Sequence, residues 1–292
     1  MTTRYNIDSC AMLVEFSAPQ WTARRLDRNT SDEVVMRKGA AAKDAARVNK
    51  HLLAGRNELE VINKKVNAAR TYVYENTLPW SDSGVRLLPT KRFTEFNERM
   101  MAFEQEFVEL VNEFVAVYPS LITAQAMALG DMFNRSEYPE PHTIARKFAF
   151  HLNYMPVPKA GDFRIDVGNE AQAELQEKLA KMADARVEAA MQDARDRLKA
   201  HLDRMMKQLH VEVDADGKAK KGKLYDSLID GGMELCDLLE SLNITNDPDI
   251  EEARRQLRSV LSTVDIVDLR KHPSARVEIR TQVAEIADKF NF

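Results

Sequence analysis

The sequence has few of the residues that interrupt helices, with only ten glycines and ten prolines in 292 residues. Both residues destabilise the interior of a helix, so their scarcity favours long uninterrupted helices. Hydrophobic residues make up 44% of the chain and charged residues 30%. This balance is typical of a protein that buries a sizeable apolar core beneath a charged surface. A mainly α-helical fold is therefore expected.

Cysteine is also scarce, and Cys10 and Cys236 lie far apart in the sequence. Their separation suits neither a metal site nor a disulfide framework, so both thiols are expected to be reduced, as in a cytosolic protein. The first residues, MTTRYNID, lack the hydrophobic core of a signal peptide, and no apolar run approaches eighteen residues. We therefore expect a cytoplasmic protein without secretion or membrane insertion.

The signature motifs of the common enzyme classes are absent. The sequence contains no Walker A loop, no GxGxxG, no HExxH, no GxSxG and no CxxC. These motifs position phosphates, dinucleotides, zinc or a nucleophile, so their usual chemistry is not indicated. The six histidines are scattered without the pairing of metal ligands. We expect no catalytic, cofactor-binding or metal-binding residues, and only an enzyme of unusual type stays open.

Net positive charge is lacking as well, because the formal net charge is −4. This argues against a globally basic nucleic-acid binder but leaves room for a local patch. Lys218, Lys220, Lys221 and Lys223 form such a cluster and could contact phosphates. No aromatic residue for base stacking is interleaved before Tyr225, so a solvated loop is the favoured interpretation. The four lysines are nevertheless candidate interaction residues.

What the sequence does contain is a pair of heptad-patterned stretches. Downstream, apolar residues recur at spacings of three and four among glutamates: Phe93, Phe96, Met100, Phe103, Phe107, Leu110, Phe114 and Val117. Upstream, the same register contains Leu52, Leu59, Ile62, Val66, Ala69 and Val73. Two such stripes joined by a short connection predict a long antiparallel helical hairpin with coiled-coil-like packing. The downstream helix, with Pro89 in its first turn, would have about 28 residues.

The connection, TLPWSDSGVRLLP at residues 77–89, is apolar where a linker is usually polar. Trp80 and Leu87 are expected to anchor this corner in the body of the protein. Ser81 and Asp82 predict a turn that caps backbone groups. Trp80, Asp82 and Arg86 are also candidate interaction residues. No histidine base lies nearby in the sequence, so a catalytic role is not indicated.

A second long helix is predicted from Asn169, a good N-cap residue, to about Leu209. This stretch has no internal glycine or proline, and its acidic and basic residues are balanced. A helix of about 40 residues spans roughly 60 Å, which is longer than a compact domain requires. We therefore expect this coiled-coil-like helix to project or to pair, which leaves a homo-oligomer open.

Short strands are predicted at residues 10–16, 148–155 and 162–167, forming a small antiparallel sheet. Ser17-Ala18-Pro19-Gln20 has a capping-box pattern that predicts a helix through Trp21 and Leu26. Three further helices are expected at about 224–242, 248–261 and 274–290. The predicted fold is mainly α with an α+β character. We expect divisions at 1–168, 169–242 and 243–292, with one continuous domain as the alternative. Residues 243–292 could pack on the long helix or form a separate subdomain.

Five motifs in order resemble an uncharacterised family of phage and bacterial proteins grouped as domain of unknown function 3150. They are TLPWSDSGVRLLP at 77–89, Val117-Tyr118-Pro119, Leu129-Gly130-Asp131-Met132-Phe133, Tyr138-Pro139, and Pro156-Val157-Pro158 with Gly161-Asp162-Phe163-Arg164-Ile165. The resemblance covers residues 45–245. It leaves the N-terminal segment and the last 45 residues uncovered, so nothing about the family carries over to them.

The resemblance implies a gene of a bacteriophage or of a prophage-bearing bacterium, and hence the cytoplasm of a bacterial host cell. Members of the family are often encoded near ring-forming AAA+ ATPases of the MoxR or CobS type and near von Willebrand-type proteins. It implies no catalytic residues. We therefore expect a non-enzymatic helical adaptor or assembly protein that partners an AAA+ ATPase or a host complex. The alternative is a nucleic-acid-binding factor of phage replication or recombination.

The heptad pattern generates a first prediction. Phe103→Asp should unfold the helical hairpin, because a carboxylate would replace an apolar side chain at the centre of the stripe. The matched surface variant, with Lys220 and Lys221 both changed to Ser, should unfold at nearly the same urea concentration as the wild type. Circular dichroism during urea titration measures both. A fully folded, stable Phe103→Asp protein would refute the stripe assignment.

Overall fold

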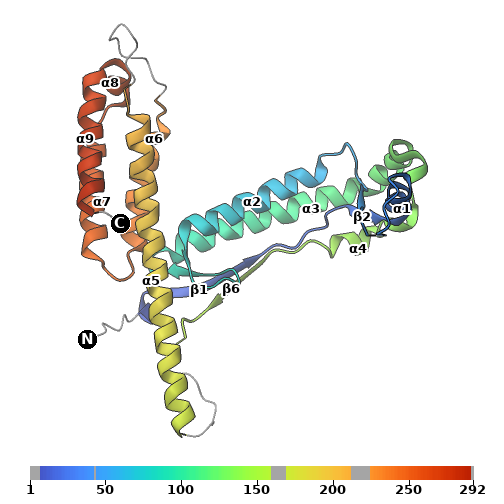
Figure 1. Cartoon of the computed structure of the whole chain (residues 1–292), viewed down its shortest axis with the longest axis horizontal. Helices are drawn as coiled ribbons and strands as arrows, with labels where there is room; N and C mark the ends of the chain where they lie inside the picture. Colours follow the sequence, from blue (N-terminus) through green and yellow to red (C-terminus); the bar gives the residue numbers. More distant parts are fainter. Residues whose placement is uncertain (1–6, 43, 159–168, 212–223, 291–292) are drawn as a thin grey trace. The chain divides into compact units, whose positions relative to one another are not determined.

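A computed structural model describes residues 7–42, 44–158, 169–211 and 224–290 (Figure 1). The described chain is mainly α-helical, with a small antiparallel sheet of four strands and a separate two-stranded sheet. The predicted fold class is thereby confirmed. The strand predicted at 162–167 lies outside the described residues.

The chain forms two compact units that do not follow sequence order. One unit contains residues 1–15, 73–96 and 153–292, and the other contains residues 16–72 and 97–152. The boundaries between the units, at residues 15, 72, 96 and 152, fall within strands or helices, so these elements contribute residues to both units. The units do not coincide with the predicted boundaries at 168 and 242, and the predicted division into folding domains stays a prediction.

The four-stranded sheet has the strand order β4-β5-β1-β6. Its strands are β4 (Leu78–Pro79), β5 (Val85–Pro89), β1 (Ala11–Ser17) and β6 (His151–Met155). β1 and β6 confirm the strands predicted at 10–16 and 148–155. The corner at 77–89 was expected to be a simple turn but is a β-hairpin, in which Leu87 pairs with Leu13 of β1 and with Leu78 of β4. Pro89 ends β5, so the prediction that it begins the following helix is wrong.

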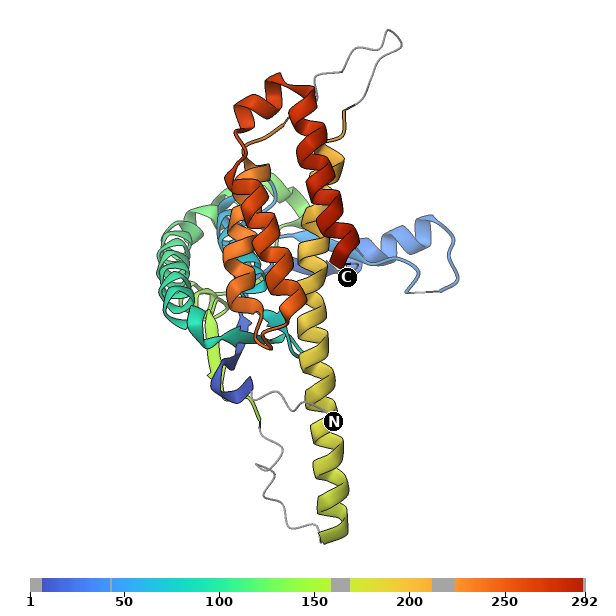
Figure 2. The same ribbon diagram turned by 90° about the vertical axis from the view of Figure 1, so that its left-hand side faces the viewer.

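The first unit also contains five helices: α5 (Asn169–Gln208), α6 (Ser227–Leu242), α7 (Pro248–Ser262), α8 (Ile266–Lys271) and α9 (Pro273–Phe290). All were predicted except the short α8. Helices α5, α6, α7 and α9 lie side by side (Figure 2). Leu198 and Leu202 of α5, Leu239 of α6, Leu257 of α7 and Val283 of α9 belong to one hydrophobic core. Residues 243–290 therefore share the core of α5 and α6.

The second unit is built on α2 (Glu58–Asn76) and α3 (Phe93–Leu129), which follows a single 3-10 turn at Thr90–Arg92. Tyr72 of α2 stacks near Phe103 of α3, with ring centroids 5.9 Å apart, and Lys65 forms an ion pair with Glu106. The earlier residue of α2, Lys65, contacts the later residue of α3, Glu106, and the later residue Tyr72 contacts the earlier Phe103. The two helices are therefore antiparallel. The predicted hairpin is therefore confirmed.

The buried side of α3 repeats every eleven residues and departs from the predicted heptad. Buried residues recur as Phe96, Phe107 and Tyr118; as Met100, Val111 and Ile122; and as Phe103, Phe114 and Gln125. Eleven residues in three turns is 3.67 per turn, closer to a straight helix than the 3.5 of a left-handed coiled coil. A heptad stripe drifts off the buried side, so Val117 is 42% exposed and its assignment to the core was wrong.

The predicted end of α3 near Val117-Tyr118-Pro119 was also wrong, because the helix continues to Leu129 with Pro119 inside it. Proline lacks the N–H that would bond four residues back. The carbonyl of Val115 is the acceptor that loses this donor. Ser120 Oγ donates to the Val117 carbonyl at 2.7 Å and Thr123 Oγ1 to the Pro119 carbonyl at 3.2 Å, so neither hydroxyl replaces the lost bond. Burial of Tyr118, Ile122 and Gln125 then stabilises the last turns.

The helix predicted from Ser17 through Leu26 was wrong. The chain instead enters β2 (Arg24–Asp27), which pairs antiparallel with β3 (Val48–His51). Trp21 stacks edge-on against Tyr118, with centroids 5.6 Å apart. These long-range contacts outweigh the local capping signal. The next helix, α1 (Arg28–Arg37), begins only after Asp27, whose Oδ1 accepts from the Thr30 backbone N–H at 3.1 Å.

Leu52 was expected in the upstream helix, but α2 begins six residues later. Leu52 is buried directly after β3, and Gly55 between the two elements has φ +71°. That backbone conformation suits glycine and breaks the helical register. The short helix α4 (Pro141–Ala145) completes the second unit, whose core also includes Leu52, Ile62, Val66 and Phe148.

Helices α5 and α6 approach closely at two glycines of α6. A methyl group added at Gly232 would lie 2.6 Å from Leu261 Cδ1 and 2.9 Å from His201 Nε2. His201 of α5 is 7% exposed, and burial, together with the positive charge of Arg204, lowers its pKa. A side chain at position 232 would therefore have to displace the side chains of Leu261 and His201.

This contact predicts opposite effects for two adjacent substitutions. Gly232→Ala should lower the free energy of unfolding by about 1–3 kcal/mol, because the new methyl group overpacks the buried contact. Gly231→Ala is the matched control, since its methyl group would lie 4.0 Å from His201 Cε1. It should stabilise by up to about 1 kcal/mol through helix propensity. Urea unfolding measures both, and equal stabilisation by the two variants would contradict the described packing.

Candidate functional site

Trp80, the first candidate residue of the corner, is buried. Its side chain is 6% exposed and belongs to the hydrophobic core of the first unit, together with Leu78 and Leu87. The guanidinium of Arg186 on α5 lies 5.5 Å from the centre of the ring, within the range of a cation–π contact. The predicted anchors of the corner are therefore confirmed.

Arg86, the second candidate, caps the C-terminal end of α2. Its Nε donates to Thr77 Oγ1 at 2.6 Å, and its Nη2 donates to the carbonyls of Thr77 at 2.9 Å and Tyr74 at 3.4 Å. The guanidinium also lies 4.4 Å from the centre of the Tyr74 ring. Carbonyls in the last turn of a helix have no partner within the helix and carry partial negative charge, so a cation suits this place.

Arg197 of α5 binds the same helix end. It donates to the carbonyl of Glu75 at 2.6 Å and to those of Tyr74 and Thr77 at 2.9 and 2.8 Å. Asp193, one turn earlier, holds its guanidinium in an ion pair at 2.7 Å. Burial and the positive charge of Arg197 both lower the pKa of Arg86. Two arginines thus share one set of carbonyls at this capped helix end.

The same chemistry recurs twice in the first unit. Arg276 Nε of α9 donates to the Leu269 carbonyl at 2.5 Å, near the end of α8. Arg280 Nε donates to the Met206 carbonyl at 3.2 Å, in the last turn of α5. The C-terminal ends of α2, α5 and α8 thus all accept hydrogen bonds from arginines of other elements.

Asp82, the third candidate, is exposed at the tip of the β4–β5 hairpin. Ser81 and Ser83 form a hydroxyl–hydroxyl hydrogen bond of 2.8 Å beside it, and Gly84 has φ +92°, as a tight turn requires. The structure does not place these residues together, because Trp80 and Arg86 point into the protein and Asp82 lies outside. Their role in binding a partner stays a prediction.

The four candidate lysines, Lys218, Lys220, Lys221 and Lys223, lie outside the described residues.

A buried ion cluster in the second unit was not predicted. Lys50 Nζ lies 2.6 Å from Glu137 Oε2 and 3.9 Å from Asp27 Oδ2, and it donates to the Met132 carbonyl at 2.7 Å. Its side chain is only 5% exposed. Acceptors surround the ammonium group, so the cluster joins β3 to the segment after α3. These residues are distant in sequence, so no local sequence pattern predicts their contact.

Sequence analysis also missed the outer face of α3. We use this name for eight exposed residues near the end of the helix: Ala116, Val117, Pro119, Ser120, Thr123, Ala126, Met127 and Ala128. No charged residue occurs between Glu113 and Asp131. The exposed side of α3 before this point carries five glutamates: Glu95, Glu98, Glu104, Glu109 and Glu113. In the sequence, this face corresponds to a run of seventeen consecutive uncharged residues, 114–130.

One helical stretch, Thr90–Met132, is long and apolar enough by length and composition to cross a membrane, with a mean hydropathy of 1.3 in its most apolar window. Ser120, Thr123 and Gln125 interrupt the stretch, so it contains no continuous apolar run of eighteen residues. Helices that form the core of a protein meet the same criterion, and α3 supplies much of the core of the second unit. The expectation of no membrane insertion stays a prediction.

Within the described ranges, no group of three or more His, Cys, Asp or Glu side chains is arranged to hold a metal ion. Neither Cys10 nor Cys236 forms a disulfide, and burial raises the pKa of Cys236 to about 11, so this thiol is protonated near neutral pH. Comparisons with family models, curated proteins and solved structures gave no significant match.

The capped end of α2 predicts a large loss of stability for Arg86→Met. The free energy of unfolding should fall by about 2–3 kcal/mol, because the carbonyls of Tyr74 and Thr77 lose one of their two charged donors and Thr77 Oγ1 loses the Arg86 Nε donor. Arg86→Lys should recover less than half of this loss, since an ammonium group cannot bond Thr77 and Tyr74 in the same fork. Asp82→Ala, on the exposed tip of the same hairpin, is the control and should change stability by less than about 0.5 kcal/mol. Equal effects of Arg86→Met and Asp82→Ala in urea unfolding would contradict the capping role.

Proposed function

We propose that the protein is a helical adaptor that binds another protein through the outer face of α3. The observation that carries this proposal is the change of the exposed side of α3 from acidic to uncharged after Glu113. A helix face that only meets water usually carries charges, as the first half of α3 does. An uncharged exposed face instead fits a surface that loses water when a partner binds.

The composition of the face favours a protein as the partner. Met127 is 90% exposed and Val117 is 42% exposed, so both can insert into a partner surface. Alanine, serine and threonine surround them, and small side chains let another helix or strand approach the backbone of α3 closely. A nucleic acid would require cations here, and the face has none.

The family resemblance of residues 45–245 supports an AAA+ ATPase or a host complex as the partner. An adaptor of this kind would present one rigid helix to the partner and hold that helix with the aromatic core formed by Phe107, Phe114 and Tyr118. These three side chains are 3%, 2% and 0% exposed. The alternative function, nucleic-acid binding, depends on the Lys218–Lys223 segment, and no feature of the described residues favours it.

The proposal is tested by site-specific crosslinking in bacterial cells that contain the native partner. A photo-reactive phenylalanine analogue at position 127 should capture a defined protein, identified by mass spectrometry. The same analogue at position 36 should not, although Met36 is 81% exposed on α1. Capture at position 127 should fall about tenfold or more when Val117 is changed to Glu, because an unpaired carboxylate is costly to bury.

Met36→Glu is the matched control and should leave capture at position 127 unchanged. Failure to capture any protein at position 127, or equal capture with and without Val117→Glu, would refute the proposal. A salt-sensitive gel shift with DNA or RNA that is lost when Lys220 and Lys221 are changed to Ser would favour the alternative instead.

A further inference from the structure

The first half of α5 extends beyond the helices that pack on its second half (Figures 1 and 2). Within the described residues, α5 contributes to the hydrophobic core only from Val187 onward. About five turns precede that residue. Isolated helices of this length are marginally stable in water, and helices in proteins are usually stabilised by packing of one face. One side of this segment is half-buried, at residues 175, 176, 179, 180, 183 and 184, and the other side is exposed. The exposed side is therefore open to contact with another molecule.

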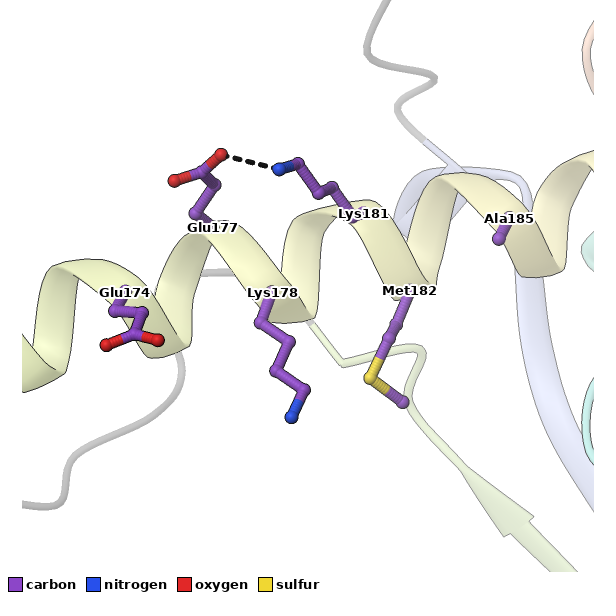
Figure 3. A pocket seen from close by; sticks show the side chains of 6 residues that line it. All are labelled: Glu174, Glu177, Lys178, Lys181, Met182 and Ala185. Atoms are coloured by element: carbon purple, nitrogen blue, oxygen red, sulfur yellow. Dashed lines mark ion pairs between the residues drawn. The ribbon is translucent and has the colours of Figure 1, made fainter.

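The exposed side of this segment has an ordered charge pattern. We call it the 174–185 face; it consists of Glu174, Glu177, Lys178, Lys181, Met182 and Ala185, which line a shallow hollow (Figure 3). The two glutamates occupy one turn, and the two lysines follow in the next. Glu174, Lys178 and Met182 point to one side of the helix, and Glu177 and Lys181 to the other. On each side of the helix, a glutamate is thus followed by a lysine four residues later: Glu174 by Lys178, and Glu177 by Lys181.

We propose that a second copy of this chain docks on the 174–185 face in antiparallel orientation. Antiparallel docking brings the acidic turn of each copy next to the basic turn of the other, so the charges attract at both ends of the contact. Parallel docking would place acidic turn beside acidic turn and basic beside basic, which is unfavourable. The antiparallel arrangement has twofold symmetry and therefore closes at a dimer.

The ion pair within the helix does not oppose this contact strongly. Lys181 Nζ lies 2.7 Å from Glu177 Oε1, and both side chains are mostly exposed, at 74% and 68%. Such exposed pairs contribute little to stability, so their charges can turn to a second copy at small cost. Met182, which is 42% exposed, adds apolar area beside the hollow. The expected dimer is weak and sensitive to salt, because the attracting charges stay near the surface.

The proposal is tested on the full chain by sedimentation equilibrium at about 50 mM and about 500 mM salt. The wild type should dimerise at micromolar concentration in low salt and dissociate at least tenfold more readily in high salt. The variant with Lys178→Glu and Lys181→Glu should have a dissociation constant at least tenfold higher. So should the variant with Glu174→Lys and Glu177→Lys, because each variant places like charges in contact.

Charge exchange separates this docking mode from a general effect of charge. An equal mixture of the two double variants should form a heterodimer, and the chain that combines all four substitutions should dimerise like the wild type. A control chain with Glu285→Lys and Asp288→Lys, two exposed residues of α9, changes the net charge by the same amount as the Glu174→Lys and Glu177→Lys variant and should dimerise normally. Circular dichroism verifies that every variant is folded.

A wild-type chain that stays monomeric at about 100 µM in low salt would overturn the proposal, because this concentration exceeds the expected dissociation constant. Failure of the mixed variants to associate would overturn it too. Neither result bears on partner binding by α3, whose test depends on position 127 and not on the self-association of α5.

Discussion

The carbonyl groups at the C-terminal end of α2 need hydrogen-bond donors, and two guanidinium groups supply them. Arg86 comes from β5 and Arg197 from α5, and both donate to the carbonyls of Tyr74 and Thr77. The last turn of α2, residues 73–76, belongs to the first unit, so β5, α5 and this turn are joined at the point where α2 ends and the β-hairpin begins. The helix end attracts the cations, and the cations fix the direction in which the chain leaves the helix. The buried corner around Trp80 depends on this junction.

This junction also explains why the most conspicuous sequence motif is structural. In the segment 77–89, Trp80 fills the core and Arg86 caps a helix, so most of its unusual composition is used inside the protein. Two other surfaces are available to partners, and they differ in chemistry. The outer face of α3 is uncharged and suits burial against a different protein. The 174–185 face of α5 carries both signs of charge in order and suits a second copy. The proposed adaptor function would use α3, and the proposed dimer would use α5.

The sequence predicted those features that depend on local pattern. The apolar stripes of α2, α3 and α5, the breaks before α7 and α9, and the strands β1 and β6 all follow from spacing or from turn residues close in sequence. The burial of Trp80 and Leu87 followed from apolar composition alone. Of the candidate interaction residues, only Asp82 lies on the described surface, while the uncharged run of α3 was present in the sequence but not recognised as a surface.

The amino-acid sequence by itself determined where the long helices lie and which side of each is mainly apolar, because these properties repeat within a few residues. Tertiary structure alone decided the rest. Residues 18–27 do not form the helix that the capping-box pattern predicts, because β2 pairs with β3 and Trp21 stacks on Tyr118. Helix α3 continued through Pro119 because burial of Tyr118 and Ile122 outweighed one lost hydrogen bond. The capping of α2 by Arg197 joins residues about 120 apart, a distance across which spacing in the sequence carries no information.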